Sequence, residues 1–337
     1  MDTNVIIETE DLVIDIPDKN LQQLLINVGL DMNNDGVIQK SEIENLVILD
    51  APDHGIHDLT GLEYAINLVS LNLAHNDIID IGPIKGLTKL TYLDLLNNAI
   101  EDFSPLQDLT NLSWLGLQSK TDISVLENLI TLHELHLKSS VMDNVDVLAK
   151  LPKLNTLNLS YSNITDLSGL GRCQELIALE LKGMIDSIDT DVIAQLDNLT
   201  TLRMQYNYLI DITFISRLNS LVNLYLNHNR IQDISPLKDL ANLAFLDLSY
   251  NKISDIEVLK NLPILNGQLS DGGTYLDLSY NLIQNIKPIA NYEGCFIRIL
   301  HNCICDKDME TREIIDKLNL NSNTVEYKIE RSFTDMA

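Results

Sequence analysis

The residues of this sequence best suited to chemistry lie in a short acidic loop near its start. From Asp31 to Glu42, side-chain oxygens recur at alternate positions, and Gly36 permits the sharp turn that such a loop needs. Calcium prefers hard oxygen ligands at this spacing. The sequence therefore predicts a structural calcium ion, although the same turns would also suit an end cap that binds no metal. The predicted ligands are Asp31, Asn33, Asp35, the Val37 carbonyl, Gln39 and a bidentate Glu42.

Catalysis has only one weak candidate. His136 lies between Glu134 and Lys138 on a predicted strand, so an acid–base pair is geometrically conceivable. A shallow sheet surface excludes little water, however, and this disfavours such chemistry. The chain also lacks a G-x-S-x-G elbow, a phosphate-binding glycine loop, an H-E-x-x-H motif and a CxxC pair. We therefore predict that it is not an enzyme.

The four cysteines have no metal-ligand spacing. Cys173 occupies an apolar repeat position and is predicted to be a buried thiol. Cys295, Cys303 and Cys305 are close enough in sequence for one disulfide in an oxidising compartment. Their redox state is open.

A repeat of about 22 residues organises the chain from Leu68 onward. Its pattern is L-x-x-L-x-L-x-x-N-x-I, in which the x-L-x-L part alternates as a strand does. The return segments are too short for full helices and contain turn signals such as Gly82-Pro83. One repeat cannot bury its apolar face alone, but stacked repeats can. Copies begin at Leu68, Leu90, Leu112, Leu132, Leu154, Leu176, Leu199, Leu221, Leu243 and near Gly273, after an insertion that contains Gly267, Gly272 and Gly273.

This pattern resembles the leucine-rich-repeat superfamily over residues 68 to about 304. The predicted fold is an α/β solenoid, right-handed and curved, with a parallel concave sheet and turns or 3₁₀ helices on the convex side. Residues 55–68 also resemble the start of the repeats in bacterial internalin-like proteins. The resemblance implies an EF-hand-like cap, followed by 22-residue repeats that bind a protein on the concave face, and a bacterial origin.

Two polar positions of the repeat are predicted to be structural. The ninth is an Asn expected to bond the neighbouring turn, and the thirteenth is an Asp expected to cap the turn that follows. The Asn positions are Asn76, Asn98, Asn207, Asn229, Asn251, Asn281 and Asn302. The Asp positions are Asp80, Asp102, Asp166, Asp211, Asp233 and Asp255.

Both ends depart from the repeat. Residues 1–67 form the N-terminal cap, in which Asp18 is predicted to cap a helix and a second helix begins near Ser41. The apolar face of the first helix is Leu21, Leu24, Leu25 and Val28. Residues 305–337 form a C-terminal cap, with a helix over 306–318 and a strand over 324–329.

Aromatic residues concentrate on the outward positions of the sheet. Seven of the eleven tyrosines and the one tryptophan fall on repeat positions 3, 5, 7 and 8. Large rigid aromatic side chains dominate interface hot spots, so these columns predict a protein-binding surface, chiefly in the C-terminal half. Cross-strand packing alone is the competing explanation. The predicted partner-binding residues are Tyr92, Trp114, His136, Tyr161, Arg203, Tyr206, Tyr225, Phe245, Tyr250, Tyr275 and Tyr280.

The middle repeats break the pattern. Between Leu112 and Asn198, other residues stand where the ladder asparagine belongs, and Lys138 and Lys182 place positive charge there. A second contact zone for an acidic partner and simple drift are both open. The replacing residues are Lys120, Ser140, Ser162 and Met184.

The formal charge of −26 disfavours a nucleic-acid partner, because it repels phosphate. No stretch reaches the roughly 18 apolar residues of a membrane helix, and we expect a monomer. Met1–Asp15 is not a signal sequence, which indicates the cytoplasm if Met1 is native. Localisation stays open, because a signal peptide removed before Met1 would mean export.

The alternative functions are a cytoplasmic regulator of an enzyme, similar to repeat-built phosphatase regulators, and a carbohydrate-binding surface protein.

Overall fold

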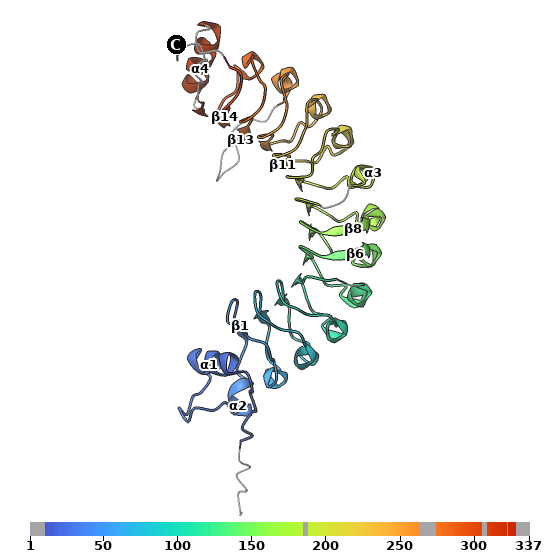
Figure 1. The fold of residues 1–337 in the computed structure, drawn as a ribbon, viewed down its shortest axis with the longest axis vertical. Coiled ribbons are helices and arrows are strands. Elements are labelled where there is room, and N and C mark those ends of the chain that lie inside the picture. The colour runs from blue at the N-terminus through green and yellow to red at the C-terminus, as the bar shows by residue number, and fades with distance from the viewer. Residues whose placement is uncertain are drawn as a thin grey trace, which may run out of the picture. The chain divides into compact units, whose positions relative to one another are not determined.

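The computed structural model describes residues 11–120, 122–184, 188–262, 274–304, 309–321 and 323–327. The chain forms two compact units, unit 1 (Met1–Leu154) and unit 2 (Asn155–Ala337). Within each unit, short parallel strands line one side of a stack of repeats and helical turns line the other (Figure 1). The predicted leucine-rich-repeat solenoid is confirmed.

The strands of each unit pair in register, one repeat with the next. In unit 1, Leu71 of one strand pairs with Leu93 of the next, and in unit 2 Leu224 pairs with Leu246. Unit 1 pairs β1 (Ile48–Asp50), β2 (Ser70–Asn72), β3 (Tyr92–Asp94), β4 (Trp114–Gly116) and β5 (Glu134–His136) in that order. Unit 2 pairs β7 (Thr156–Asn158), β9 (Ala178–Glu180), β10 (Thr201–Arg203), β11 (Asn223–Tyr225), β12 (Phe245–Asp247), β13 (Thr274–Asp277), β14 (Cys295–Arg298) and β15 (Thr324–Glu326). Two further strands, β6 (Val141–Asn144) and β8 (Asn163–Asp166), lie within the irregular middle repeats, between the sheet strand and the 3₁₀ turn of each.

The return segments are single turns, mostly 3₁₀, as the turn signals predicted. They are η1 (Leu62–Tyr64), η2 (Gly82–Ile84), η3 (Ser104–Asp108), η4 (Ser124–Asn128), η5 (Asp146–Lys150), η6 (Ser168–Arg172), α3 (Thr190–Ile193), η7 (Thr213–Arg217), η8 (Ser235–Leu237), η9 (Glu257–Asn261) and η10 (Lys287–Ile289). The predicted aspartate caps are confirmed. Asp233 Oδ1 accepts the Ser235 N–H at 2.8 Å, and each of the other five aspartates accepts the backbone N–H of the residue two positions after it.

An aliphatic core and an asparagine ladder hold the stack together. The repeat leucines, such as Leu224 and Leu246, are fully buried. Asn251 Nδ2 donates to the carbonyls of Leu226 and Leu248, both at 3.0 Å, and its Oδ1 accepts the Ile231 N–H. The predicted structural role of the ninth position is thereby confirmed, since this side chain satisfies buried backbone groups of two adjacent repeats.

Both caps form as expected in outline. In unit 1, α1 (Lys19–Asn27) begins at the N-cap Asp18, and α2 (Lys40–Ile43) is a single turn. Val28 was wrongly predicted to lie on the apolar face of the first helix, since it is the C-cap and 53% exposed. In unit 2, α4 (Met309–Leu320) and β15 form the C-terminal cap.

Several sequence predictions fall on residues outside the described ones. These are the insertion with Gly267, Gly272 and Gly273, the residue Cys305, the start of the last helix at 306–308, the end of the last strand at 328–329, and Met1–Glu10. Cys173 and Cys295 are buried free thiols, and burial raises the pKa of each to about 11. Cys303 is exposed. No described helix is long and apolar enough to cross a membrane.

Candidate functional site

A row of stacked aromatic side chains crosses the strand face of unit 2. It consists of Tyr225, Phe245, Tyr275 and Phe296, from β11, β12, β13 and β14, and is called the sheet row here. Ring centroids lie 4.5 Å apart for the first pair, 4.4 Å for the second and 5.6 Å for the third. Adjacent parallel strands lie about 4.8 Å apart, so rings on neighbouring outward positions must stack.

Charged side chains extend this row toward the start of unit 2. The Arg203 guanidinium lies 3.8 Å from the centre of the Tyr225 ring, and its Nε lies 3.3 Å from Glu180 Oε1. Asn158 Nδ2 donates in turn to Glu180 at 2.6 Å. At the other end, Arg298 pairs with Asp277 at 3.5 Å. Contacts between side chains therefore run unbroken from β7 to β14.

A second row lies in the turns that follow the strands. It consists of Tyr206, His228, Tyr250, Tyr280 and His301, called the edge row here, with successive centroids 4.2, 4.1, 4.0 and 4.3 Å apart. Every member has a positive φ, between 52° and 61°, and immediately precedes a ladder asparagine. This left-handed turn at position 8 carries the ring out of the strand, and the following asparagine turns inward.

The edge row ends at Tyr206 because the preceding repeat has glycine at position 8. A Cβ on Gly183 would lie 2.8 Å from the Tyr161 ring, so only glycine fits there. Lys182 fills the gap, with its Nζ 5.4 Å from the centre of the Tyr161 ring and 5.2 Å from that of Tyr206. Tyr161 is thus joined to the edge row through a cation rather than by stacking.

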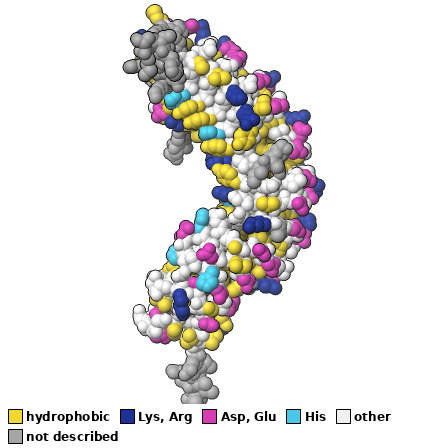
Figure 2. Space-filling view, in the orientation of Figure 1, with side chains coloured by type: hydrophobic (Ala, Val, Ile, Leu, Met, Phe, Trp, Pro, Cys, Tyr) yellow, Lys and Arg dark blue, Asp and Glu magenta, His cyan; other side chains and the backbone are white. Residues whose placement is uncertain are grey.

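The surface is hollowed beside the edge row. A shallow depression of about 420 Å³ lies there, and above its floor the Arg230 guanidinium lies 4.7 Å from the centre of the Tyr208 ring. In the upper part of Figure 2, hydrophobic and histidine side chains alternate over this region, with Lys and Arg beside them. The lining residues are Tyr206, Tyr208, His228, Asn229, Arg230, Tyr250, Asn251 and Tyr280.

The surroundings favour the neutral form of three ring residues in these rows. Burial raises the pKa of Tyr275 to about 12, and a hydrogen bond with Tyr280 raises the pKa of Tyr250. Burial, helped by the charge of Lys182, lowers the pKa of His228, which favours its uncharged form.

Unit 1 has a smaller aromatic stack. Trp114 lies between Tyr92 and His136, at 4.4 and 4.9 Å. A Cβ on Gly116 would lie 2.8 Å from the tryptophan ring, so the glycine lets that ring lie flat against the strand. Burial raises the pKa of the neighbouring Asp94. His136 Nε2 lies 2.6 Å from Glu134 Oε1, so the sequence-predicted pair exists as an ion-pair contact on a partly exposed surface.

All of the predicted partner-binding residues lie on these surfaces, but in separate groups. Tyr92, Trp114 and His136 form the unit 1 stack. Arg203, Tyr225, Phe245 and Tyr275 belong to the sheet row and its extension, whereas Tyr206, Tyr250 and Tyr280 belong to the edge row. His228, His301 and Phe296 were not among the predicted site residues. Their shared repeat positions with the tyrosines were the available signal.

The loop between α1 and α2 contains the predicted calcium ligands. Asp31 Oδ2 accepts the Gly36 N–H at 3.0 Å, and Glu42 accepts those of Met32 and Gln39 at 2.8 and 2.9 Å. Gln39 Oε1 is buried and has no hydrogen-bond partner. Among the described residues, no three His, Cys, Asp or Glu side chains gather as a metal-binding group. The donors nevertheless fit calcium in kind, because all are oxygens and one of them is buried and unsatisfied.

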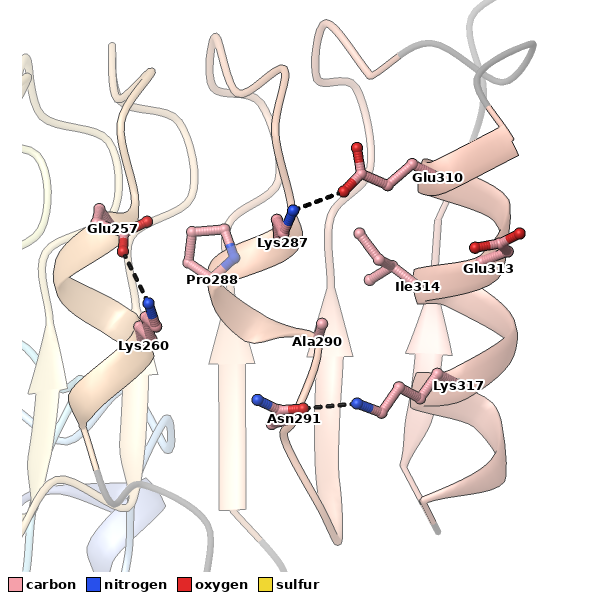
Figure 3. Close-up of a pocket in the computed structure, with 10 residues that line it drawn as sticks. All are labelled: Glu257, Lys260, Lys287, Pro288, Ala290, Asn291, Glu310, Glu313, Ile314 and Lys317. Carbon is pink, nitrogen blue, oxygen red and sulfur yellow. Dashed lines mark hydrogen bonds and ion pairs between the residues drawn. The ribbon is translucent and has the colours of Figure 1, made fainter.

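A larger depression, of about 600 Å³, lies on the helical side of unit 2 between η9, η10 and α4 (Figure 3). Each of its three lysines has a polar partner. Lys260 lies 3.4 Å from Glu257, Lys287 lies 2.8 Å from Glu310, and Lys317 donates to an asparagine at 2.6 Å. Two of the three cations are therefore paired with carboxylates within the groove.

Known proteins share this architecture. A family profile described as "Leucine Rich repeats (2 copies)" matches residues 66–108 and 219–261, and a "Leucine Rich repeat" profile matches 150–170. The chain is 27% identical to an internalin (inlF) of Listeria monocytogenes, over 98% of this chain and 96% of that one, with a TM-score of 0.72. A comparison with curated proteins found no sequence match.

Two further structures show the fold alone. The mouse RP105/MD-1 complex matches with 22% identity over 85% of this chain and 51% of that one, at a TM-score of 0.69. The functional domain of InlJ from Listeria monocytogenes matches with 22% identity over 92% of this chain and 60% of that one, at a TM-score of 0.58. Leucine-rich-repeat folds generally mediate protein binding, and internalin-like ones are typically non-enzymatic. The chain is an internalin-like leucine-rich-repeat protein.

Proposed function

We propose that this protein binds another protein on the strand face of unit 2, through the sheet row and the edge row. The observation that carries the proposal is the continuous stacking of aromatic rings across consecutive repeats. Each ring holds its neighbour, so the surface is rigid before a partner arrives and little side-chain entropy is lost on binding. Tyr206, Tyr250 and Tyr280 remain between 38% and 44% exposed, so much of their area is free to be buried.

The stacking also favours protein over carbohydrate as the partner. Sugars pack against the open faces of aromatic rings. The inner rings, such as Phe245 and Tyr250, have both faces covered by their neighbours and present only their edges. Ring edges and tyrosine hydroxyls suit the mixed polar and apolar surface of a protein. A regulator of an enzyme would also bind a protein through such contacts, so that alternative function is consistent with the proposal.

The binding test compares two triple variants. One is Tyr225→Ala, Phe245→Ala and Tyr275→Ala in the sheet row, and the other is Tyr206→Ala, Tyr250→Ala and Tyr280→Ala in the edge row. Because truncated hot-spot residues each cost about 2 kcal/mol or more, we expect at least tenfold weaker binding of the partner for each variant. Partners are identified by affinity capture with mass spectrometry, and affinities are then measured with the purified partner.

The matched control removes exposed apolar side chains elsewhere. Ile66, Ile79 and Ile130 of unit 1 are each at least 50% exposed, and their replacement by alanine should leave binding unchanged. Circular dichroism and melting curves check that all three variants fold. If both aromatic variants captured the partner as the wild type does, this site assignment would be wrong.

We also propose that the loop from Asp31 to Glu42 holds a structural calcium ion. The support is the oxygen ligand set at the required spacing, together with the buried unsatisfied Gln39 Oε1. Hydrogen bonds, led by that of the Val37 N–H, lower the pKa of Asp35, so its carboxylate is charged and ready to bind a cation. A bound ion would tie the loop between α1 and α2 and thereby stabilise the N-terminal cap.

Calcium in hundredfold excess over its Kd should stabilise the folded protein by about 2.7 kcal/mol and raise the Tm by several degrees. The variant Asp31→Asn with Asp35→Asn keeps the shape of both side chains but removes their charge, and should lose this response. Calorimetric titration and melting curves with and without chelator measure both effects. Asp80→Asn with Asp102→Asn, in exposed turn caps, is the control for lost charge. Absence of both binding heat and a melting shift in the wild type would refute the site.

A further inference from the structure

Among the described residues, the edge of unit 2 that carries the edge row contains no acidic residue, and Asp186, at one of the same repeat positions, lies outside the described residues. This edge strip comprises repeat positions 7 to 12, from the end of each strand to the turn that follows. At the chain's average of 49 acidic residues in 337, a strip of this length would hold about five. Its residues are 160–165, 182–184, 205–210, 227–232, 249–254, 279–284 and 300–304.

Unit 1 shows that the repeat itself does not require acidic residues to be absent from these positions. The same positions there carry one acidic residue in each of the three repeats that begin at Leu68, Leu90 and Leu132. They are Asp77, Glu101 and Asp143. The fold therefore tolerates a carboxylate at these positions, and the edge strip of unit 2 differs from unit 1 in its chemistry alone.

The edge strip instead carries three cations, Lys182, Arg230 and Lys252. None of them forms an ion pair with a described carboxylate, whereas Arg203 and Arg298 on the adjoining sheet are both paired. Lys182 and Arg230 lie over tyrosine faces, which position them without neutralising them. The described part of the strip therefore has a net positive charge on a chain whose formal charge is −26.

The carboxylates nearest to the strip in sequence act as caps of the following turns. Asp211, Asp233 and Asp255 occupy position 13, where the chain has left the strip for the helical side. Each accepts the backbone N–H two residues on, at 2.8 Å. These caps secure the turns, and no described carboxylate is paired with the cations of the strip.

The aromatic rings of the strip also favour a negatively charged ligand. Stacked rings point their edges outward, and the edge of an aromatic ring is its electropositive part. The hydroxyls of Tyr206, Tyr250 and Tyr280 add hydrogen-bond donors along the depression that Arg230 also lines. Ring edges, hydroxyl donors and unpaired cations all favour a negatively charged group in this hollow.

We propose that the edge strip of unit 2 binds an acidic, Asp- or Glu-rich segment of the partner protein. This inference rests on the proposed function and specifies the chemistry of the partner. A protein segment fits better than nucleic acid, because the repulsion of the whole chain acts on every phosphate of a long polyanion, whereas a short acidic segment meets only the local field.

The test uses a fluorescein-labelled oligoglutamate peptide with glycine spacers and measures fluorescence anisotropy. The variant Arg230→Glu with Lys252→Glu should bind the peptide at least tenfold more weakly than wild type, because two attractive charges become repulsive. Its control is Lys85→Glu with Lys153→Glu, two exposed lysines of unit 1 with no ion pair among the described residues, which makes the same charge change. Added salt should weaken binding to wild type.

Three outcomes would overturn the inference: no peptide binding to wild type, equal loss in both double variants, or displacement of the peptide by inorganic phosphate or oligothymidylate at lower concentration than by free oligoglutamate. Arg230→Ala with Lys252→Ala gives a second check, with an intermediate loss expected. The sheet-row variant separates this inference from the proposed function. If it loses the partner while the charge-reversed variant keeps both partner and peptide, the proposed function stands and the acidic segment does not.

Discussion

Replacing Asp18 with alanine should destabilise the protein by about 3–5 kcal/mol, more than any other single change in the N-terminal cap. Its carboxylate is fully buried and joins two segments. Oδ1 accepts the Asn20 and Leu21 N–H groups at 2.9 and 3.0 Å, and Oδ2 accepts those of His57 and Asp58 at 2.8 and 3.2 Å. Alanine leaves all four donors unsatisfied, and urea denaturation measures the loss.

The same carboxylate should make the cap sensitive to acid. Burial alone would raise the pKa of Asp18, but the N–H donors of His57, Leu21 and Asp58 outweigh it and lower the pKa below its ordinary value of 3.8. A depressed folded-state pKa contributes stability that is present above about pH 4 and is lost as the pH falls through the folded pKa. The stability difference between wild type and Asp18→Asn should therefore shrink in that acid range.

Two variants complete this test. Asp18→Asn keeps one acceptor for the helix N-terminus and should fall between wild type and alanine. Asp233→Ala, which removes an exposed cap with a single backbone bond, should cost less than about 1 kcal/mol. A cost at Asp18 no larger than at Asp233 would show that the buried carboxylate does not hold α1 to residues 57 and 58.

The repeat period allowed most of the scaffold to be predicted from the sequence. Leucines three and two residues apart define each strand, and the asparagine and aspartate that follow have only one use in such a short turn. The structural roles of Asn251 and Asp233 followed from this regularity. Repetition helped because each regular repeat uses the same residue types for its strand and turn, so the structure predicted for one repeat applies to the others.

Features set by a single residue could not be predicted in this way. Neither the extended segment Ile48–Asp50 nor the strands β6 and β8 within the irregular repeats carry the leucine pattern. The position of Trp114 depends on Gly116, whose missing Cβ leaves room for the ring, and the end of the edge row depends likewise on Gly183. Spacing shows where a glycine stands, but not which neighbouring ring will cover it.

The division of the tyrosines into two rows also needed the structure. The sheet row uses repeat positions 3 and 5 and the edge row uses position 8, and the sequence pattern treats all three as outward positions of one sheet. Position 8 adopts a positive φ that few tyrosines have, and this moves Tyr206, Tyr250 and Tyr280 from the sheet into the turns. The sequence analysis therefore predicted one surface, whereas the structure places these residues in two rows with different charged neighbours.

Asn251→Ala should cost about 2–4 kcal/mol, because it removes hydrogen bonds from buried backbone groups of two repeats. The carbonyls of Leu226 and Leu248 each lose one donor and keep another, from Asn229 and Asn281. The Ile231 N–H loses its acceptor and is left unsatisfied. Asn251→Asp should be at least as damaging, since a carboxylate can still accept but cannot donate to either carbonyl. Denaturant titration measures both variants.

Asn242→Ala is the control variant. It distinguishes the loss of a ladder asparagine from the loss of an ordinary surface asparagine. Asn242 is exposed and makes one bond, from Nδ2 to the Asn219 carbonyl at 3.0 Å, so its loss should cost less than about 0.5 kcal/mol. If Asn251→Ala were as mild as Asn242→Ala, the ladder would serve register rather than stability.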